Sequence, residues 1–160
     1  MSRKGQSKIR AVKPDAVYQS VTVSKLINYA MRHGKKTASV KEVYNAIELL
    51  KKETKTDDVI TTLEQALDNI KPKVEVRPRR IGGAVYQVPT PVRGNRQLSL
   101  AIRWLVTNAR KLSNKGFHSF AEKLNSELVL ALKNEGASVA KRAEVEKMAD
   151  ANKAFAHLRW

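Results

Sequence analysis

Residues 73–89 read KVEVRPRRIGGAVYQVP and differ in pattern from the rest of the chain. β-Branched residues lie on both sides of the Gly82-Gly83 pair, and a Gly-Gly pair between two such runs is typical of a tight hairpin turn. Pro78 and Pro89 cannot donate a backbone hydrogen bond, which suits strands at the edge of a sheet. The stretch therefore predicts a two-stranded antiparallel β-hairpin.

The predicted hairpin carries a strong positive charge. Its basic residues, opposed only by Glu75, are Lys71, Lys73, Arg77, Arg79 and Arg80. Edge strands often carry lysine because charge prevents strand-to-strand aggregation, and this explanation needs no ligand. Three arginines within four residues go beyond that need, and the guanidinium fork matches the geometry of a phosphate group. The pattern favours an arm that binds nucleic acid.

Helical patterns occupy the chain on both sides of the hairpin. Apolar residues there recur at three- and four-residue spacing, which indicates helices with one buried face. The predicted helices cover residues 20–32, a segment that begins at Ser39, and residues 57–70, 96–112, 118–134 and 138–152. Residues 153–160 form a short tail. The sequence thus predicts a mainly α fold: one six-helix domain over residues 1–160, with a protruding basic β-hairpin.

Two of these helices have specific signals at their start. Ser39-Val40-Lys41-Glu42 matches a capping box, in which the serine and the glutamate each accept a hydrogen bond from a free backbone amide. Asp57 and Asp58 open the next helix, where the helix dipole favours negative charge. In the last helix we expect Val145, Met148 and Ala149 to face the core.

The composition points to a polyanionic partner. The 160 residues include 31 lysines and arginines but only 15 aspartates and glutamates, which gives a net charge of +16 and a pI of about 10.3. A surface of this kind favours nucleic acid, with an anionic membrane surface as the alternative. Cysteine is absent, which excludes disulfides and thiolate chemistry. No apolar run approaches the roughly 18 residues of a membrane span, and residues 1–15 lack the apolar segment of a secretory signal.

Residues 1–13 predict a flexible basic arm. The segment holds no acidic residue and carries Arg3, Lys4, Lys8, Arg10 and Lys13. Such a segment typically becomes ordered on a polyanion, although a solvated tail has the same composition.

Arg96, Arg103 and Arg110 form a stripe on the helix predicted at 96–112. They are seven residues apart, so each step is two turns minus about 20°, and the stripe is roughly 21 Å long. Residues 91–121 contain no acid that would neutralise it. A charged helix face is often only solvated, but an all-arginine stripe favours phosphate contact. Trp104 lies beside the stripe, where it either stacks on a base or joins the core.

Catalysis has little support in the sequence. Gly34-Lys35-Lys36 lacks the upstream glycine of a phosphate-binding P-loop, so the two lysines are interpreted as phosphate contacts or plain surface charge. His33, His118 and His157 have no partner at metal-ligand spacing. His118 is expected to pack within GFHSF. We expect no catalytic residue, no bound metal and no cofactor, with Mg²⁺ only as a counterion of RNA.

Four segments carry a resemblance to a known family. VEVRPRRIGGAVYQVP, LSLAIRWLV, HGKK and the ending MADANKAFAHLRW are similar in sequence and order to bacterial ribosomal protein seven of the small subunit. The resemblance implies six helices with a protruding hairpin. It implies binding to the 3′ major (head) domain of 16S-type rRNA and an early role in head assembly. It also implies a cytoplasmic location in the ribosome, without a membrane or a homo-oligomer.

The resemblance further implies which residues bind. Residues carried over as rRNA contacts are Arg3, Lys4, Lys8, Arg10, Lys35, Lys36, Lys73, Arg77, Arg79, Arg93, Arg96, Arg103, Arg110, Lys111, Lys115, Lys141 and Arg142. Those carried over as contacts of the exit-site tRNA are Arg80, Gly82, Gly83 and Ala84. The hairpin and the C-terminal region are expected near the mRNA path and ribosomal protein eleven. The segment Leu112 to Phe120 looks longer than is usual in the family.

Two other protein classes fit parts of the pattern. A DNA-bending chromosomal protein is also basic, helical and equipped with a β-arm, but such arms usually insert an apolar wedge, and only Ile81 is available here. An RNA-modifying enzyme would need a cofactor pocket, which no motif indicates.

Overall fold

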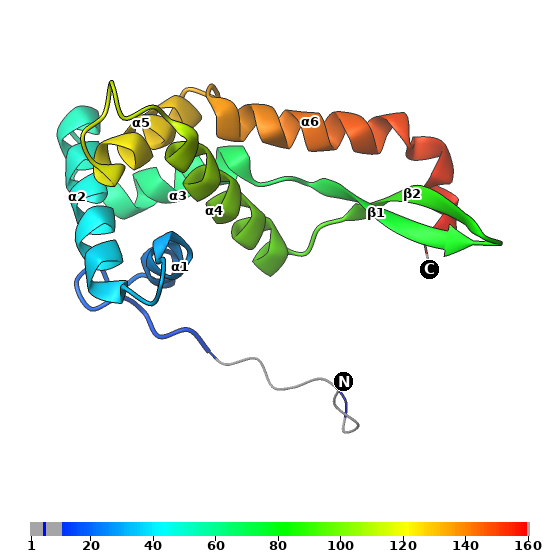
Figure 1. Cartoon of the computed structure of the whole chain (residues 1–160), viewed down its shortest axis with the longest axis horizontal. Coiled ribbons are helices and arrows are strands. Elements are labelled where there is room, and N and C mark those ends of the chain that lie inside the picture. Colours follow the sequence, from blue (N-terminus) through cyan, green and yellow to red (C-terminus); the bar gives the residue numbers. More distant parts are fainter. Residues whose placement is uncertain (1–4, 6–10, 160) are drawn as a thin grey trace.

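The computed structural model describes residue 5 and residues 11–159. The predicted contacts Arg3, Lys4, Lys8 and Arg10, and most of the predicted basic arm, lie outside the described residues. The elements, in chain order, are α1 (Val21–Ala30), α2 (Lys36–Thr54), α3 (Val59–Ile70), β1 (Val74–Ile81), β2 (Ala84–Pro91), α4 (Gly94–Lys111), α5 (Phe120–Leu132), α6 (Ala137–Ala151) and the 3₁₀ helix η1 (Lys153–Leu158). The prediction of a mainly α fold with a hairpin is confirmed (Figure 1).

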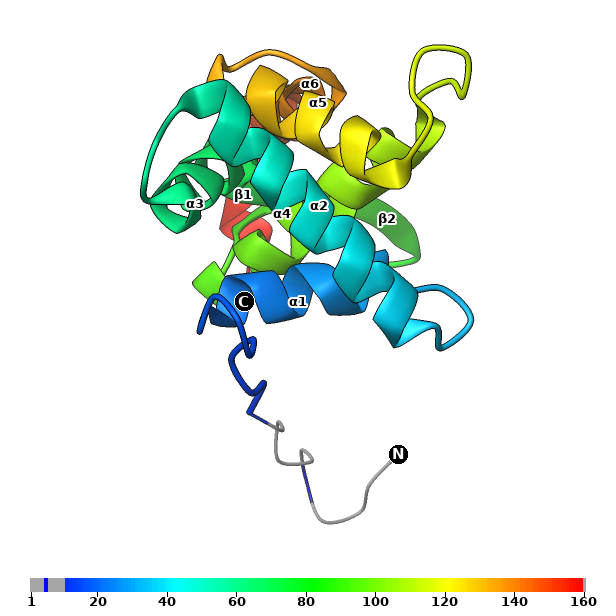
Figure 2. The same cartoon turned by 90° about the vertical axis from the view of Figure 1, so that its left-hand side faces the viewer.

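Helices α1 to α5 form a bundle around one hydrophobic core (Figure 2). Helix α5 packs against α2, α3 and α4, so its leucines lie at the centre. The largest fully buried side chains include Leu26, Ile47, Leu63, Leu67, Ile102, Leu105, Leu124 and Leu128. Each comes from the apolar face that the helical spacing indicated. No helix in the described part of the chain is long and apolar enough to cross a membrane.

The hairpin extends away from the bundle, with α6 lying along it (Figure 1). Strands β1 and β2 pair antiparallel from Val74 opposite Pro91 to Ile81 opposite Ala84. Gly82 and Gly83 form the two-residue turn with φ of 56° and 92°, and positive φ at both positions is what a type I′ turn requires. Helix η1 returns the chain to β2, where the Phe155 and Tyr86 rings lie 5.4 Å apart. A ribbon that would be marginal alone is thus held by packing on one side.

The capping box predicted at Ser39 is wrong. Helix α2 begins at Lys36, so Ser39 lies inside the helix, where its hydroxyl donates to the Ile27 carbonyl at 2.8 Å. The Glu42 carboxylate accepts from the Ala121 amide at 2.9 Å. The two polar side chains therefore join α2 to α1 and to the start of α5. By contrast, Asp58 is the N-cap of α3 and accepts from the Thr61 amide at 3.3 Å, as the acidic start indicated.

The inward position expected for Met148 is also wrong. Met148 is 43% exposed and Val145 is half-buried, whereas Ala149 is buried as expected. The reason is that α6 leaves the bundle after its first turns and continues along the thin hairpin (Figure 1). A two-stranded ribbon covers less of a helix than a bundle does.

Candidate nucleic-acid interface

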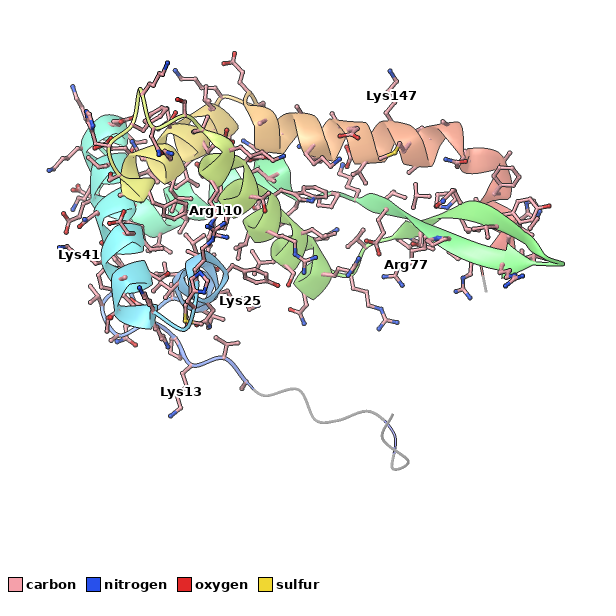
Figure 3. All side chains as sticks on the ribbon, in the orientation of Figure 1. Lys13, Lys25, Lys41, Arg77, Arg110 and Lys147 are labelled. Carbon is pink, nitrogen blue, oxygen red and sulfur yellow. The ribbon has the colours of Figure 1, made fainter. Side chains whose placement is uncertain are left out.

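An arginine-lined hollow of about 480 Å³ lies where the base of the hairpin meets the start of α4 and the end of the chain. We call it the arginine cleft. Its lining residues are Arg77, Thr90, Pro91, Val92, Arg93, Arg96 and Arg159. Four guanidinium groups thus share one concave surface, drawn from β1, the turn before α4, α4 itself and the C-terminal tail. Figure 3 shows Arg77 on the side of the hairpin away from α6.

Glu75 holds two of these arginines in place. Glu75 is 6% exposed, and its carboxylate accepts from Arg77 Nε at 2.6 Å and from Arg96 Nε at 2.8 Å. The Arg77 and Arg96 side chains remain 51% and 49% exposed, so both still present N–H groups to solvent. A buried carboxylate that orients two guanidinium groups lowers the entropy lost when they bind a ligand. The acid that pairs with Arg96 thus comes from the hairpin and not from residues 91–121, which contain none.

The three arginines of the α4 stripe have different surroundings. Arg103 is exposed, and together with the hydrogen bond to Ser99 its nearby charge lowers the Tyr29 pKa. Arg110 Nη2 donates to the Ala30 carbonyl at 2.7 Å, and its guanidinium carbon lies 5.9 Å from the centroid of the Phe120 ring. Burial, aided by the nearby charge of Arg32, lowers the Arg110 pKa. Trp104 is partly buried against the core, which favours the packing interpretation.

We expect Arg110→Met to lower the free energy of unfolding by about 1–3 kcal/mol, because the Ala30 carbonyl at the end of α1 loses a charged donor. The matched variant, Arg103→Met, removes the same charge from an exposed position and should change stability by no more than about 0.5 kcal/mol. Urea unfolding followed by circular dichroism measures both. Equal stability of the two variants would contradict a structural role for Arg110.

A second basic hollow, of about 310 Å³, lies at the turn between α1 and α2. Its lining includes Arg32, His33, Lys35 and Arg110, together with Glu42 and Phe120. Lys36 opens α2 and is exposed beside it. The left-handed backbone of Gly34, with φ of 72°, makes the turn that brings this run of basic residues to the surface.

Other predicted contacts lie outside the two hollows. Lys111 and Lys115 are exposed at the end of α4 and in the following loop, and Lys73 is exposed at the foot of the hairpin. His118 is exposed in that loop, so the expectation that it packs is wrong. Arg79 is half-buried on β1, while Arg80, Gly82, Gly83 and Ala84 are exposed at the hairpin tip.

The α6 residues are occupied with partners from the protein. Arg142 Nη1 donates to the Asn69 carbonyl at 2.5 Å, and its Nε lies 3.9 Å from Glu146. Lys141 forms an ion pair with Glu144 at 2.8 Å. Arg142 therefore secures the end of α3, and its role as an rRNA contact stays a prediction.

Sequence reasoning missed Arg32 and Arg159. Arg32 is adjacent to the HGKK segment, so counting it with that basic turn would have found it. Arg159 carries no comparable signal, because only the packing of η1 on β2 brings the end of the chain to the arginine cleft. In residues 5 and 11–159 no three His, Asp or Glu side chains form a group that would hold a metal ion.

Comparisons with known proteins point to the same family as the resemblance in the sequence. Residues 2–153 match the family model described as ribosomal protein S7p/S5e. Proteins named small ribosomal subunit protein uS7 are similar over the full length of both chains: the one from Thermodesulfovibrio yellowstonii is 52% identical and the one from Stenotrophomonas maltophilia K279a 45% identical, each with 100% of both chains covered. The one from Thermosipho africanus is 51% identical, with 99% of both chains covered.

Proposed function

This chain belongs to the ribosomal protein S7p/S5e family, and on that premise we propose that it holds the head domain of small-subunit rRNA in its folded form. Membership in the family makes it a structural constituent of the small ribosomal subunit, not an enzyme. The finer proposal is that it binds the 3′ major domain of 16S-type rRNA and nucleates assembly of the head.

The arginine cleft is the observation that carries this proposal. Where RNA helices converge, phosphates approach one another and repel, so the junction needs fixed positive charge. Four arginines in one concavity, two of them oriented by Glu75, supply such charge in a set geometry. Structured RNA is recognised largely through its shape, its phosphates and its 2′-hydroxyls, all of which a rigid cationic cleft can contact. The exposed Arg103 and the hollow at the α1–α2 turn extend the same kind of surface over the bundle.

The hairpin tip is proposed to approach the exit-site tRNA and the nearby mRNA. Arg80 and the Gly82–Ala84 turn are exposed at the far end of the arm, and the two glycines let an RNA backbone come close. Because η1 packs on β2, the C-terminal region and the arm form one continuous surface. We propose that this combined surface also faces ribosomal protein eleven.

Binding of the purified protein to three ligands tests the proposal: a head-domain rRNA junction, a scrambled RNA of equal length and duplex DNA, with salt titrated at constant Mg²⁺. If about eight phosphates are neutralised, the log–log slope of affinity against salt should be near −7 by the duplex-DNA rule and shallower for irregular RNA. We expect the junction to bind at least about 100-fold more tightly than the other ligands at moderate salt. Equal binding of all three ligands would mean that the surface binds any polyanion without preference, and this would refute the proposal.

A further inference from the structure

A groove with a different character lies between α2 and α5, at the end of the molecule opposite the hairpin (Figure 1). It is a hollow of about 360 Å³ that we call the α2–α5 groove. Its lining residues are Leu49, Glu53, Phe117, Glu122, Asn125, Ser126, Val129 and Leu130. A smaller hollow of about 250 Å³ continues it, shares Leu49 and Glu122, and adds Glu48 and Lys52. The surface is therefore apolar at its base and acidic at its rim.

Asn125 has an unsatisfied hydrogen-bond acceptor within this groove. The side chain is 5% exposed, and its Nδ2 donates to Glu53 Oε1 at 2.6 Å. Its Oδ1 is buried and accepts no hydrogen bond from any described residue. Buried polar atoms in proteins nearly always have a partner, and an unpaired one is costly to keep. A donor brought by a ligand would remove that cost.

The carboxylates of the groove also lack cationic partners. Among residues 5 and 11–159, no lysine or arginine forms an ion pair with Glu48, Glu53 or Glu122, although the chain carries a net charge of +16. Lys52 lines the smaller hollow but forms no ion pair with any of these three carboxylates. The backbone amides of His118 and Ser119 lower the Glu122 pKa, which keeps its carboxylate ionised. An RNA phosphate would be repelled here.

We propose that the α2–α5 groove binds a basic segment of a neighbouring ribosomal protein. A lysine or arginine side chain of that segment lays its aliphatic stem on Leu49 and Val129 and donates to Glu53. A small rotation of the Asn125 amide brings its Oδ1 to the same donor. Charge complementarity and the unpaired acceptor of Asn125 support this docking. The proposed docking is independent of the arginine cleft, which lies at the base of the hairpin and carries the opposite charge.

Site-directed crosslinking in the assembled subunit tests this proposal. The chain has no cysteine, so Ser126→Cys provides a single thiol in the groove that a benzophenone maleimide labels before reconstitution into small subunits. After irradiation, mass spectrometry identifies the crosslinked peptide. We expect a peptide from another ribosomal protein that contains lysine or arginine at or beside the crosslink. Crosslinks to rRNA alone, to a second copy of this chain, or to nothing in fully assembled particles would overturn the proposal.

Charge reversal separates docking from simple proximity. Glu48→Lys combined with Glu53→Lys in the labelled protein should lower the crosslink yield about tenfold or more, because the basic segment then meets like charge. The control is a second double reversal, Glu144→Lys with Asp150→Lys, which adds the same charge on exposed positions of α6. Its crosslink yield should match that of the unaltered protein within about twofold. Equal yields from the two double variants would mean that the acidic rim does not bind the segment.

Discussion

Replacing Glu75, Arg77 and Arg96 together by glutamine is expected to lower the affinity for the rRNA junction about 100-fold. Each arginine lost from the arginine cleft removes a charged hydrogen bond to phosphate of about 1.5–3 kcal/mol, and two at the lower limit give about 3 kcal/mol. Changing Glu75 at the same time avoids a buried carboxylate without partners, which would destabilise the fold and confuse the result. The slope of affinity against salt should become shallower by about 1.5, for two phosphates fewer.

Lys147→Gln is the matched control for this triple variant. Both change the net charge by the same amount, and Lys147 points outward from α6, on the opposite edge from Arg77 (Figure 3). We expect its affinity to stay within about twofold, because an exposed charge outside the interface acts only through a screened field. If the control loses as much affinity as the triple variant, total charge and not the cleft decides binding.

Leu105→Ala should give the largest loss of stability. Leu105 is fully buried on α4, where that helix faces the centre of the bundle. Truncating a leucine there removes apolar contacts and leaves a cavity that rigid neighbours fill only in part, which costs about 3–5 kcal/mol. Urea unfolding of the two proteins measures the difference. A folded domain of this kind is stable by only about 5–15 kcal/mol, so the variant should also melt at a clearly lower temperature.

Met148→Ala is the comparison for the core variant. Met148 is 43% exposed on α6, although its spacing in the sequence suggested the core. Its truncation should change the free energy of unfolding by no more than about 0.5–1 kcal/mol. A loss equal to that of Leu105→Ala would mean that α6 is covered in solution by more than the hairpin.

Local patterns predicted the elements well. The spacing of Ile102, Leu105 and Ala109 indicated α4 and its buried face, and the Gly82-Gly83 pair indicated the hairpin turn. These features depend on residues within one or two turns of each other. The same reasoning failed at Ser39, because a capping box and a serine that bridges two helices have the same local sequence.

The candidate site was found in part. Arg77 was named from the density of arginines on the hairpin, Arg96 from its spacing on the helix and Arg93 from the family resemblance, and the structure brings all three together in one cleft. The contact of Arg96 with Glu75 was not foreseen, because the two residues are 21 positions apart in the sequence. Arg110 looked identical to Arg103 by spacing, yet only Arg110 contacts the Ala30 carbonyl, 80 residues away.

The sequence by itself determined the helices, the hairpin, the overall positive charge and the absence of thiol chemistry. The spacing of apolar residues and the local charge are properties of neighbouring residues, so both can be recognised without knowledge of the fold. Only the tertiary structure decided which arginines stay available to a ligand, how Arg159 joins the cleft and where the acidic groove lies. These features depend on contacts between distant segments, and such contacts arise only when the burial of apolar faces fixes how the helices pack.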